Sequence, residues 1–183
     1  MAKLLSETKI LTNNIRASYE HLLKPSSFSG GPLKYSICAI IDKGDKDTLA
    51  IINQAIKNAE NRGVEKFGEK FKNAKKHNPL HDGDVEKVGQ AGYENGIYFN
   101  CSNETKPKVL DASTGLNAEE TAIYSGMYGK LICNFYPYYA SASSCGVSCT
   151  LLGFQKTKDR EVLGGMHVSD SDFDDDDEDS FLN

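Results

Sequence analysis

The sequence predicts a mainly β fold of the α+β kind: a small antiparallel barrel or sandwich of about five strands with one main helix. Three observations lead to this expectation. The chain has 183 residues, which suits one domain with a real core. Several stretches alternate or run apolar as strands do, and turn residues separate them. A single stretch repeats its apolar residues at helical spacing.

The first strand is expected within residues 8–22, where the odd-numbered residues from Ile15 to His21 share one face at period two. A break rich in Gly, Pro and Ser follows it. The second strand is expected at Lys34–Ile41, which ends in a buried apolar run. The remaining strands are expected at residues 96–102, 109–110, 127–139 and 146–156, with a hairpin loop at 140–145.

The helix is expected to open at Gly44–Asp45, where the side chain of Asp45 or Asp47 can cap it, and to end at Gly63. Between these residues Leu49, Ile52 and Ile56 recur at helical spacing. Residues 62–92 form a long, polar excursion with little periodicity. A loop of that length in a small domain is usually functional or mobile.

Charge is divided unevenly along the chain. Residues 1–169 hold 21 basic and 18 acidic residues, a net charge of +3, whereas residues 170–183 hold eight acidic residues and no basic one. A run of acidic residues cannot bury surface and is expected to stay disordered. We therefore expect a folded domain over residues 1–166 and a disordered acidic tail over residues 167–183.

The sequence lacks the features of secreted, membrane-spanning and disulfide-bonded proteins. The first 20 residues lack the apolar centre of a signal peptide. The longest uncharged run, Leu131–Gln155, contains Asn134, Pro137 and several Ser and Thr residues, so it is not a membrane span. Five cysteines without paired spacing indicate reduced thiols. These features favour a cytoplasmic protein without membrane contact.

Tyrosine and lysine alternate on one predicted strand. Tyr128, Lys130 and Tyr136 share one face of the strand at 127–139, while the other face is plainly apolar. Nucleic-acid bases stack on aromatic rings for roughly 1–3 kcal/mol each, and cations follow the phosphates. The alternative is that tyrosine is simply a good strand former on a half-buried surface.

The same pairing recurs at Lys34–Tyr35 and at Tyr98 with Lys106 and Lys108. For Lys106-Pro107-Lys108 the ordinary explanation is a polar loop. Residues 62–76 are also basic, with two interleaved phenylalanines, and their ordinary explanation is the solvated face of a short helix.

Enzyme and metal sites have weaker support. His77, His81 and Asp84 could ligate a metal, but a zinc site would need cleaner paired spacing. Residues 143–149 resemble a nucleophile turn without its strand-to-helix context. We expect no catalytic residues, no cofactor and no metal.

The order of several short motifs resembles a known family. They are Arg16-Ala17-Ser18-Tyr19, Pro79-Leu80-His81-Asp82-Gly83-Asp84, Tyr98-Phe99, Tyr124-Ser125-Gly126-Met127-Tyr128-Gly129-Lys130, Asn134-Phe135-Tyr136, and Leu163-Gly164-Gly165 before the acidic tail. The chain is similar to the single-stranded DNA-binding proteins of phages, an OB-fold family related to the replication proteins of short-tailed phages. The resemblance covers most of residues 8–183.

The resemblance implies a five-stranded OB barrel with a helix and long loops. It also implies sequence-independent binding of single-stranded DNA in phage DNA replication and recombination. The tail of similar proteins contacts replication partners such as a polymerase or helicase, and often supports a homodimer. Phe181 lies third from the end here, whereas related tails finish on an aromatic residue.

The alternation and the Tyr–Lys pairing together predict the DNA-binding residues. Phosphates are expected to meet Arg16, Lys34, Lys106, Lys108 and Lys130, and bases to stack on Tyr35, Tyr98, Tyr128 and Tyr136. The same phosphate contacts would allow weaker binding of duplex DNA.

The acidic tail is expected to mimic a phosphate chain, to compete with DNA and to dock on a partner. The residues concerned are Asp174, Asp175, Asp176, Asp177, Glu178, Asp179 and Phe181. One alternative is a merely solubilising tail, and another is an acidic-tailed interaction module that ignores nucleic acid.

Overall fold

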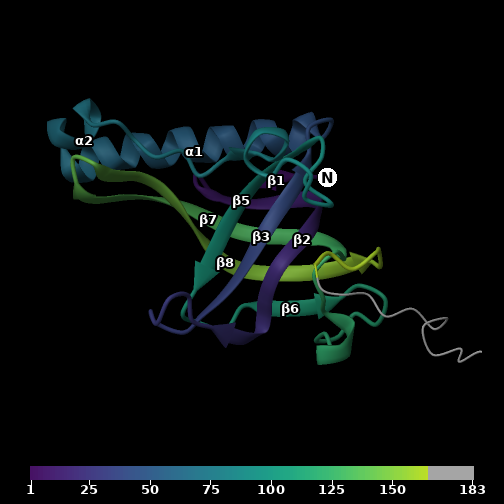
Figure 1. Cartoon of the computed structure of the whole chain (residues 1–183). Coiled ribbons are helices and arrows are strands. Elements are labelled where there is room, and N and C mark those ends of the chain that lie inside the picture. The colour runs from purple at the N-terminus through teal and green to yellow at the C-terminus, as the bar shows by residue number, and fades with distance from the viewer. Residues whose placement is uncertain (165–183) are drawn as a thin grey trace, which may run out of the picture.

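The computed structural model describes residues 1–164, which form one eight-stranded sheet and a few helices (Figure 1). The strands are β1 (Lys3–Leu4), β2 (Lys9–Ser26), β3 (Lys34–Asp42), β4 (His81–Asp82), β5 (Gly96–Asn103), β6 (Lys108–Asp111), β7 (Tyr128–Ser141) and β8 (Ser144–Lys158). The helices are α1 (Lys46–Phe67), α2 (Glu69–Asn73), α3 (Gly83–Glu86) and the 3-10 turn η1 (Glu120–Ala122).

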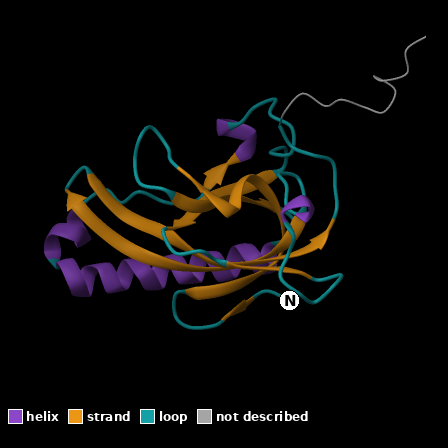
Figure 2. Cartoon of the chain, turned by 90° about the horizontal axis from the view of Figure 1, so that it is seen from below, coloured by secondary structure: helices purple, strands orange, loops and turns teal. Residues whose placement is uncertain are grey.

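Five strands of the sheet close into a barrel. β2 pairs antiparallel with β3 and with β7, β3 pairs with β5, and β7 pairs with β8. A parallel bridge between Ser102 of β5 and Thr150 of β8 completes the ring. Figure 2 shows the strands curving around a common interior, with α1 along one side. The mainly β class and the five-stranded closed barrel expected from the sequence are confirmed.

Helix α1 covers the barrel with one apolar face. The side chain of Asp45 accepts a hydrogen bond from the Thr48 N–H at 3.1 Å, as expected of a cap. Ile52 and Ile56 are buried against the barrel core, and burying such a side chain contributes about 1.5–3 kcal/mol. The same stripe, continued through Ala59, fixes which face of α1 meets the sheet.

The predicted end of this helix at Gly63 is wrong, because α1 continues to Phe67. Gly63 is needed for close packing instead, since a Cβ there would lie 2.3 Å from the ring of Phe71. The helix stops at Gly68, whose φ of +71° suits glycine and whose N–H bonds to the carbonyl of Val64.

A β-bulge overturns the predicted alternation in the first strand. Pairing between β2 and β3 shifts between Ser18 and His21, and Tyr19 at this point has a φ of +44°. As a result Tyr19 and His21 are exposed, and Leu22 takes the buried position. An extra residue on one strand reverses which side chains point inward beyond it.

The expected loop at residues 62–92 is largely structured. It contains the end of α1 and all of α2, β4 and α3, and the ring of Phe71 is fully buried. The hairpin between the last two strands is also tighter than expected, because Ser141 pairs with Ser144 and only Ala142 and Ser143 remain in the turn. Burial of Phe71 and pairing of β4 with β5 order the first stretch, and pairing of β7 with β8 that extends to Ser141 and Ser144 shortens the second.

Candidate nucleic-acid interface

A groove crosses the outer face of the barrel where β3 and β5 run side by side. It consists of two depressions of about 460 and about 470 Å³, and Asn100 of β5 lines both. Ser36 and Ser102, which pair across these strands, continue its floor. Phe99 points the other way into the core, because successive side chains of a strand face opposite sides. The floor is therefore polar and the layer beneath it is apolar.

Aromatic side chains from the β7–β8 hairpin line one end of the groove. They are Tyr136, which is 40% exposed, and Tyr138, which lies two residues later on the same face of the strand. His77 lies opposite them on a segment tied to β8. Its N–H donates to the Cys145 carbonyl at 2.8 Å, and its carbonyl accepts from the Val147 N–H at 3.2 Å. The backbone thus fixes both sides of this end.

The turn between β2 and β3 and the bulge of β2 line the other end. Phe28 is 91% exposed at this turn, where its carbonyl accepts a hydrogen bond from the Gly31 N–H at 3.0 Å. Tyr19 is 59% exposed, and its hydroxyl accepts a hydrogen bond from Gln90 Nε2 at 2.8 Å. Lys87 Nζ lies 5.9 Å from the centre of the Tyr19 ring. Two exposed aromatic rings therefore line this end, and a cation lies beside one of them.

Tyr98, which the sequence predicts as a stacking residue, lies in a packed wall beside the groove. It is only 6% exposed. The ring of His81 stacks on it at 5.1 Å and 22°, and the ring of Tyr93 meets it edge-on at 5.2 Å. Tyr98 thus offers no free ring face in this structure, because neighbouring residues already cover it.

The buried polar atoms of this wall remain neutral. The Tyr93 hydroxyl donates to Ser18 Oγ at 3.0 Å and lies 3.4 Å from Cys38 Sγ. Burial raises the pKa of the Cys38 thiol to about 11, and burial also raises the pKa of Tyr93. Because the thiolate is the reactive form of cysteine, Cys38 is a poor nucleophile at neutral pH. The wall acts as a scaffold.

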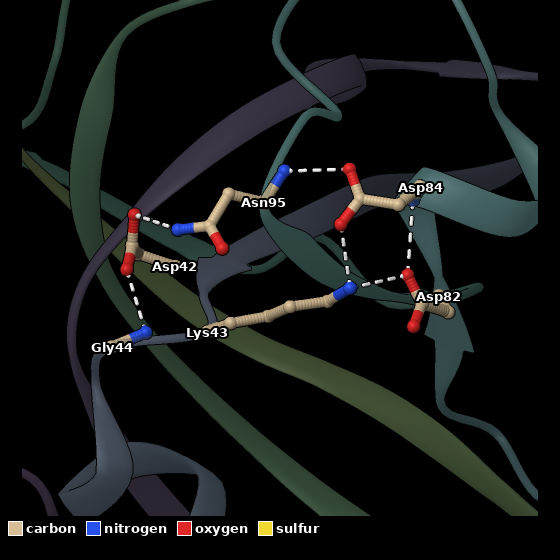
Figure 3. Close-up of polar contacts among 6 residues, drawn as sticks. All are labelled: Asp42, Lys43, Gly44, Asp82, Asp84 and Asn95. Atoms are coloured by element: carbon tan, nitrogen blue, oxygen red, sulfur yellow. Dashed lines mark hydrogen bonds and ion pairs between the residues drawn. The ribbon is translucent and has the colours of Figure 1, made fainter.

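A set of polar contacts, called the clasp below, fixes residues 82–95, which include Tyr93 of the wall, to the end of β3 (Figure 3). Lys43 Nζ binds Asp82 Oδ1 at 2.7 Å and Asp84 Oδ2 at 2.6 Å. Asn95 joins them, since its N–H donates to Asp84 at 2.9 Å and its side-chain amide donates to Asp42 at 3.3 Å. Hydrogen bonding to the two carboxylates raises the pKa of Lys43, and hydrogen bonding to Lys43 lowers that of Asp84. The clasp holds both ends of residues 82–95.

Three predicted DNA-binding residues lie together on another face, along β2 and β7. The guanidinium of Arg16 lies 6.0 Å from the ring centre of Tyr128, and Lys130 follows on the same strand face. Arg16 also donates to the carbonyl of Gly126 at 3.3 Å and to that of Glu161 at 3.2 Å. It therefore ties down the chain as it leaves the barrel, which leaves fewer donors for a phosphate.

The other predicted residues are dispersed. Lys34 begins β3 opposite Ser26, which lines the groove. Tyr35 points inward and packs against the core, so it does not share the outer face. Lys106 and Lys108 are exposed, but neither lines the groove, and Lys108 begins β6, which pairs with β8. Of the predicted stacking residues, Tyr136 alone lines the groove among the residues the structure describes.

A metal site and a membrane span find no geometric support in residues 1–164. His77 and His81 have ring centres 5.8 Å apart, while Asp84 is held by Lys43. Within the described part of the chain, no group of three or more His, Cys, Asp or Glu residues is placed to hold a metal ion. No helix there has the length and apolar character needed to cross a membrane.

Comparison with known proteins identifies the family. The family model described as the single-stranded DNA-binding protein of Enterobacter phage Enc34 matches residues 8–182. The chain belongs to this family. Protein p50 of Acyrthosiphon pisum secondary endosymbiont phage 1 is 34% identical over 175 residues, which cover 91% of this chain and 93% of that protein.

Solved structures show the same fold. The single-stranded DNA-binding protein of bacteriophage Enc34 in complex with single-stranded DNA has a TM-score of 0.70 and 26% identity, covering 88% of this chain and 96% of that chain. The single-stranded DNA-binding protein gp2.5 of bacteriophage T7 has a TM-score of 0.64 at 16% identity, covering 97% and 99% of the two chains. The OB fold implied by the sequence resemblance is thereby confirmed.

Several groove residues of this Enc34-family protein were not predicted from sequence. Phe28 had a usable signal, as a lone aromatic residue among Ser, Gly and Pro in a turn. Tyr19 had none, because its exposure depends on the bulge. Asn100 and His77 are ordinary polar residues until the barrel brings them together. The predicted tail residues 174–179 and Phe181 lie outside the described residues.

Proposed function

We propose that this protein binds single-stranded DNA, without sequence preference, in the groove across β3 and β5. The observation that carries the proposal is the pair of aromatic ends: exposed Tyr19 and Phe28 at one end, and exposed Tyr136 with half-buried Tyr138 at the other. They flank a polar floor on the face that OB folds use for oligonucleotides. The Enc34 relative, solved in complex with single-stranded DNA, supports single-stranded DNA as the ligand.

The chemistry of the groove suits binding and does not suggest catalysis. Every base has a π-face, so each stacked ring contributes roughly 1–3 kcal/mol whatever the sequence. Ser36, Asn100 and Ser102 can exchange hydrogen bonds with any base edge or sugar. Lys34 and Lys87, near the turn end, can neutralise phosphates.

The biological role that fits this activity is phage DNA replication and recombination. We propose further that the acidic tail competes with DNA and recruits replication proteins. The tail region, residues 170–183, carries eight acidic residues against a body of net charge +3. Gly164, the last described residue, lines a depression together with Tyr19, so the described part of the chain ends beside one end of the groove.

The face that carries Arg16, Tyr128 and Lys130 is a second candidate surface for DNA. The contact between Arg16 and Tyr128 favours it, because a cation beside a ring is the pairing that a stacked, charged strand requires. Within residues 1–164, the depression that Arg16 and Tyr128 line has no lining residue in common with the groove. Separate substitutions can therefore distinguish the two surfaces.

The test is a titration of a labelled oligo-dT with the full chain and its variants. The double variant Phe28→Ala and Tyr136→Ala is expected to weaken binding by about 2–6 kcal/mol if both rings stack. Leu116→Ala, which removes another exposed apolar side chain (69% exposed), is the control. A double variant that binds as the control does would exclude the groove. A loss confined to Tyr128→Ala with Lys130→Ala would assign DNA to the β2–β7 face.

An interaction module that ignores nucleic acid is the alternative function, and the acidic tail is the feature that favours it. It predicts that neither surface responds to DNA. Changing Asp174, Asp175, Asp176 and Asp177 to Asn separates the two functions. Tighter DNA binding by this full-length variant supports the competing tail, whereas absence of DNA binding in both forms supports the interaction module.

A further inference from the structure

A ridge of lysines, of which one makes an ion pair within residues 1–164, runs from the end of α1 through α2 to the residues after it. Residues 66–76 contain five lysines and one acidic residue, Glu69. The lysine ridge consists of Lys66, Lys70, Lys72, Lys75 and Lys76. Figure 1 shows α2 beside the tip of the β7–β8 hairpin, the same hairpin whose tyrosines line the groove.

Aromatic packing holds the ridge against the hairpin. The ring of Phe67 lies 5.9 Å from that of Tyr139, and Lys70 Nζ lies 4.9 Å from the centre of the Tyr139 ring. The buried ring of Phe71 supports Lys76 Nζ at 5.4 Å. The ridge is thus a fixed part of the fold and not a loose loop.

Little of its charge is balanced by the protein. Within residues 1–164, the one ion pair that a ridge lysine makes joins Lys72 to Glu69 at 3.4 Å, and both side chains are largely exposed. An exposed pair of this kind is worth little. Like charges held close together repel one another, so a polyanion that neutralises them is favoured.

The ridge is continuous with the groove. His77, which lines the hairpin end of the groove, is two residues from Lys75, and two residues span at most about 7 Å. The chain here lies tightly on β8, because a Cβ on Gly146 would come within 2.4 Å of the His77 carbonyl oxygen. The thiol of Cys145 also contacts the carbonyl of Lys75 at 3.8 Å.

From this continuity we infer that the lysine ridge is a second phosphate-binding surface, which takes the DNA strand where it leaves the groove beside Tyr136 and Tyr138. This inference rests on the proposed function. Lysine is a mobile point charge that meets phosphate without fixed geometry, so the ridge would grip the backbone and leave the bases unread. The groove would bind a short oligonucleotide, and the ridge would add contacts only to a longer one.

The experiment compares a short oligo-dT of about 8 nucleotides with a long one of about 25, bracketing the site sizes of single OB folds. The ridge variant is the full chain with Lys70→Gln, Lys72→Gln and Lys75→Gln. The control variant is the full chain with Lys3→Gln, Lys46→Gln and Lys57→Gln. These three lysines are exposed and lie outside the ridge, and replacing them removes the same net charge. Glutamine keeps the helix propensity of lysine.

The ridge variant is expected to bind the long oligonucleotide at least about tenfold more weakly than the control does, and the short one equally well. Its salt dependence on the long oligonucleotide should flatten by about two, because each phosphate contact adds about −0.7 to the slope. An equal loss on both lengths, or no loss beyond the control, overturns the inference. Failure of the unmodified chain to bind either length would instead overturn the proposed function.

A last arm distinguishes DNA from the acidic tail as the occupant of the ridge. The lysine substitutions are repeated in the full chain carrying Asp174→Asn, Asp175→Asn, Asp176→Asn and Asp177→Asn. If the ridge binds DNA, the loss on the long oligonucleotide persists in this background. If the loss disappears, the ridge serves the tail and the inference is overturned.

Discussion

At the scale of the residue, the backbone of Tyr19 stands out, because its φ of +44° is a conformation that non-glycine residues rarely adopt. Such a conformation costs a non-glycine residue about 1–2 kcal/mol. The bulge nevertheless presents the ring to solvent at the end of the groove, where Lys87 lies 5.9 Å from it. Strain that persists at a candidate binding site suggests that the ring is kept for binding.

Replacing Tyr19 by Gly therefore separates stability from function. Glycine removes the strain but costs about 0.5–1 kcal/mol in chain entropy, so we expect stability to be unchanged or slightly raised. Binding of oligo-dT should fall by about 1–3 kcal/mol with the loss of a stacking ring. Urea denaturation and DNA titration measure the two effects, with Tyr19→Phe as the control that keeps the ring. Wild-type affinity in the Gly variant would remove Tyr19 from the binding surface.

At the scale of the element, the segment 82–95 shows how few contacts position a wall of the groove. Lys43 ties its start through Asp82 and Asp84, and Asn95 ties its end. The sequence could not reveal this clasp, because Lys43 is 39 residues from Asp82 and 41 residues from Asp84 along the chain. Helix α1 was predictable from its own periodicity, but its true end was not, since Gly63 serves packing against Phe71.

Breaking the clasp with Lys43→Met should lower stability in a pH-dependent way. The carboxyl of Asp84 has a pKa lowered below its ordinary 3.8, so its contribution is complete above that pH and is lost as pH falls through the lowered value. The pKa of Lys43 is raised above 10.5, so its contribution is complete below that pH. The urea midpoint of the variant should thus fall clearly below wild type at pH 7.

Lowering the pH should shrink the difference between the two proteins, because protonated carboxyls no longer pair with Lys43. Lys46→Met, an exposed substitution in the first turn of α1, is the matched control. A Lys43→Met deficit as large at pH 2 as at pH 7 would show that the ion pairs do not hold the wall.

At the scale of the whole molecule, the groove is built by closure of the barrel. Its lining comes from β2 and the turn after it, from β3, β4, β5, β7 and β8, and from the segment before β4. The bridge between Ser102 and Thr150 closes the ring of strands that brings them together. The positions of the five barrel strands and the fold class were predictable from alternation and turn residues, because these are local patterns; the two-residue strands β1 and β4 were not predicted. The groove was not, since long-range register decides that Tyr136 lines it while Tyr35 points into the core.

The most direct test of single-stranded DNA binding is a titration of the full chain with a labelled oligo-dT and a duplex of matched length, at two salt concentrations. We expect tight single-strand binding that weakens as salt rises, with a slope of about −0.7 for each phosphate contacted, and weaker duplex binding. Absence of single-strand binding, or an affinity that does not change with salt, would contradict this expectation.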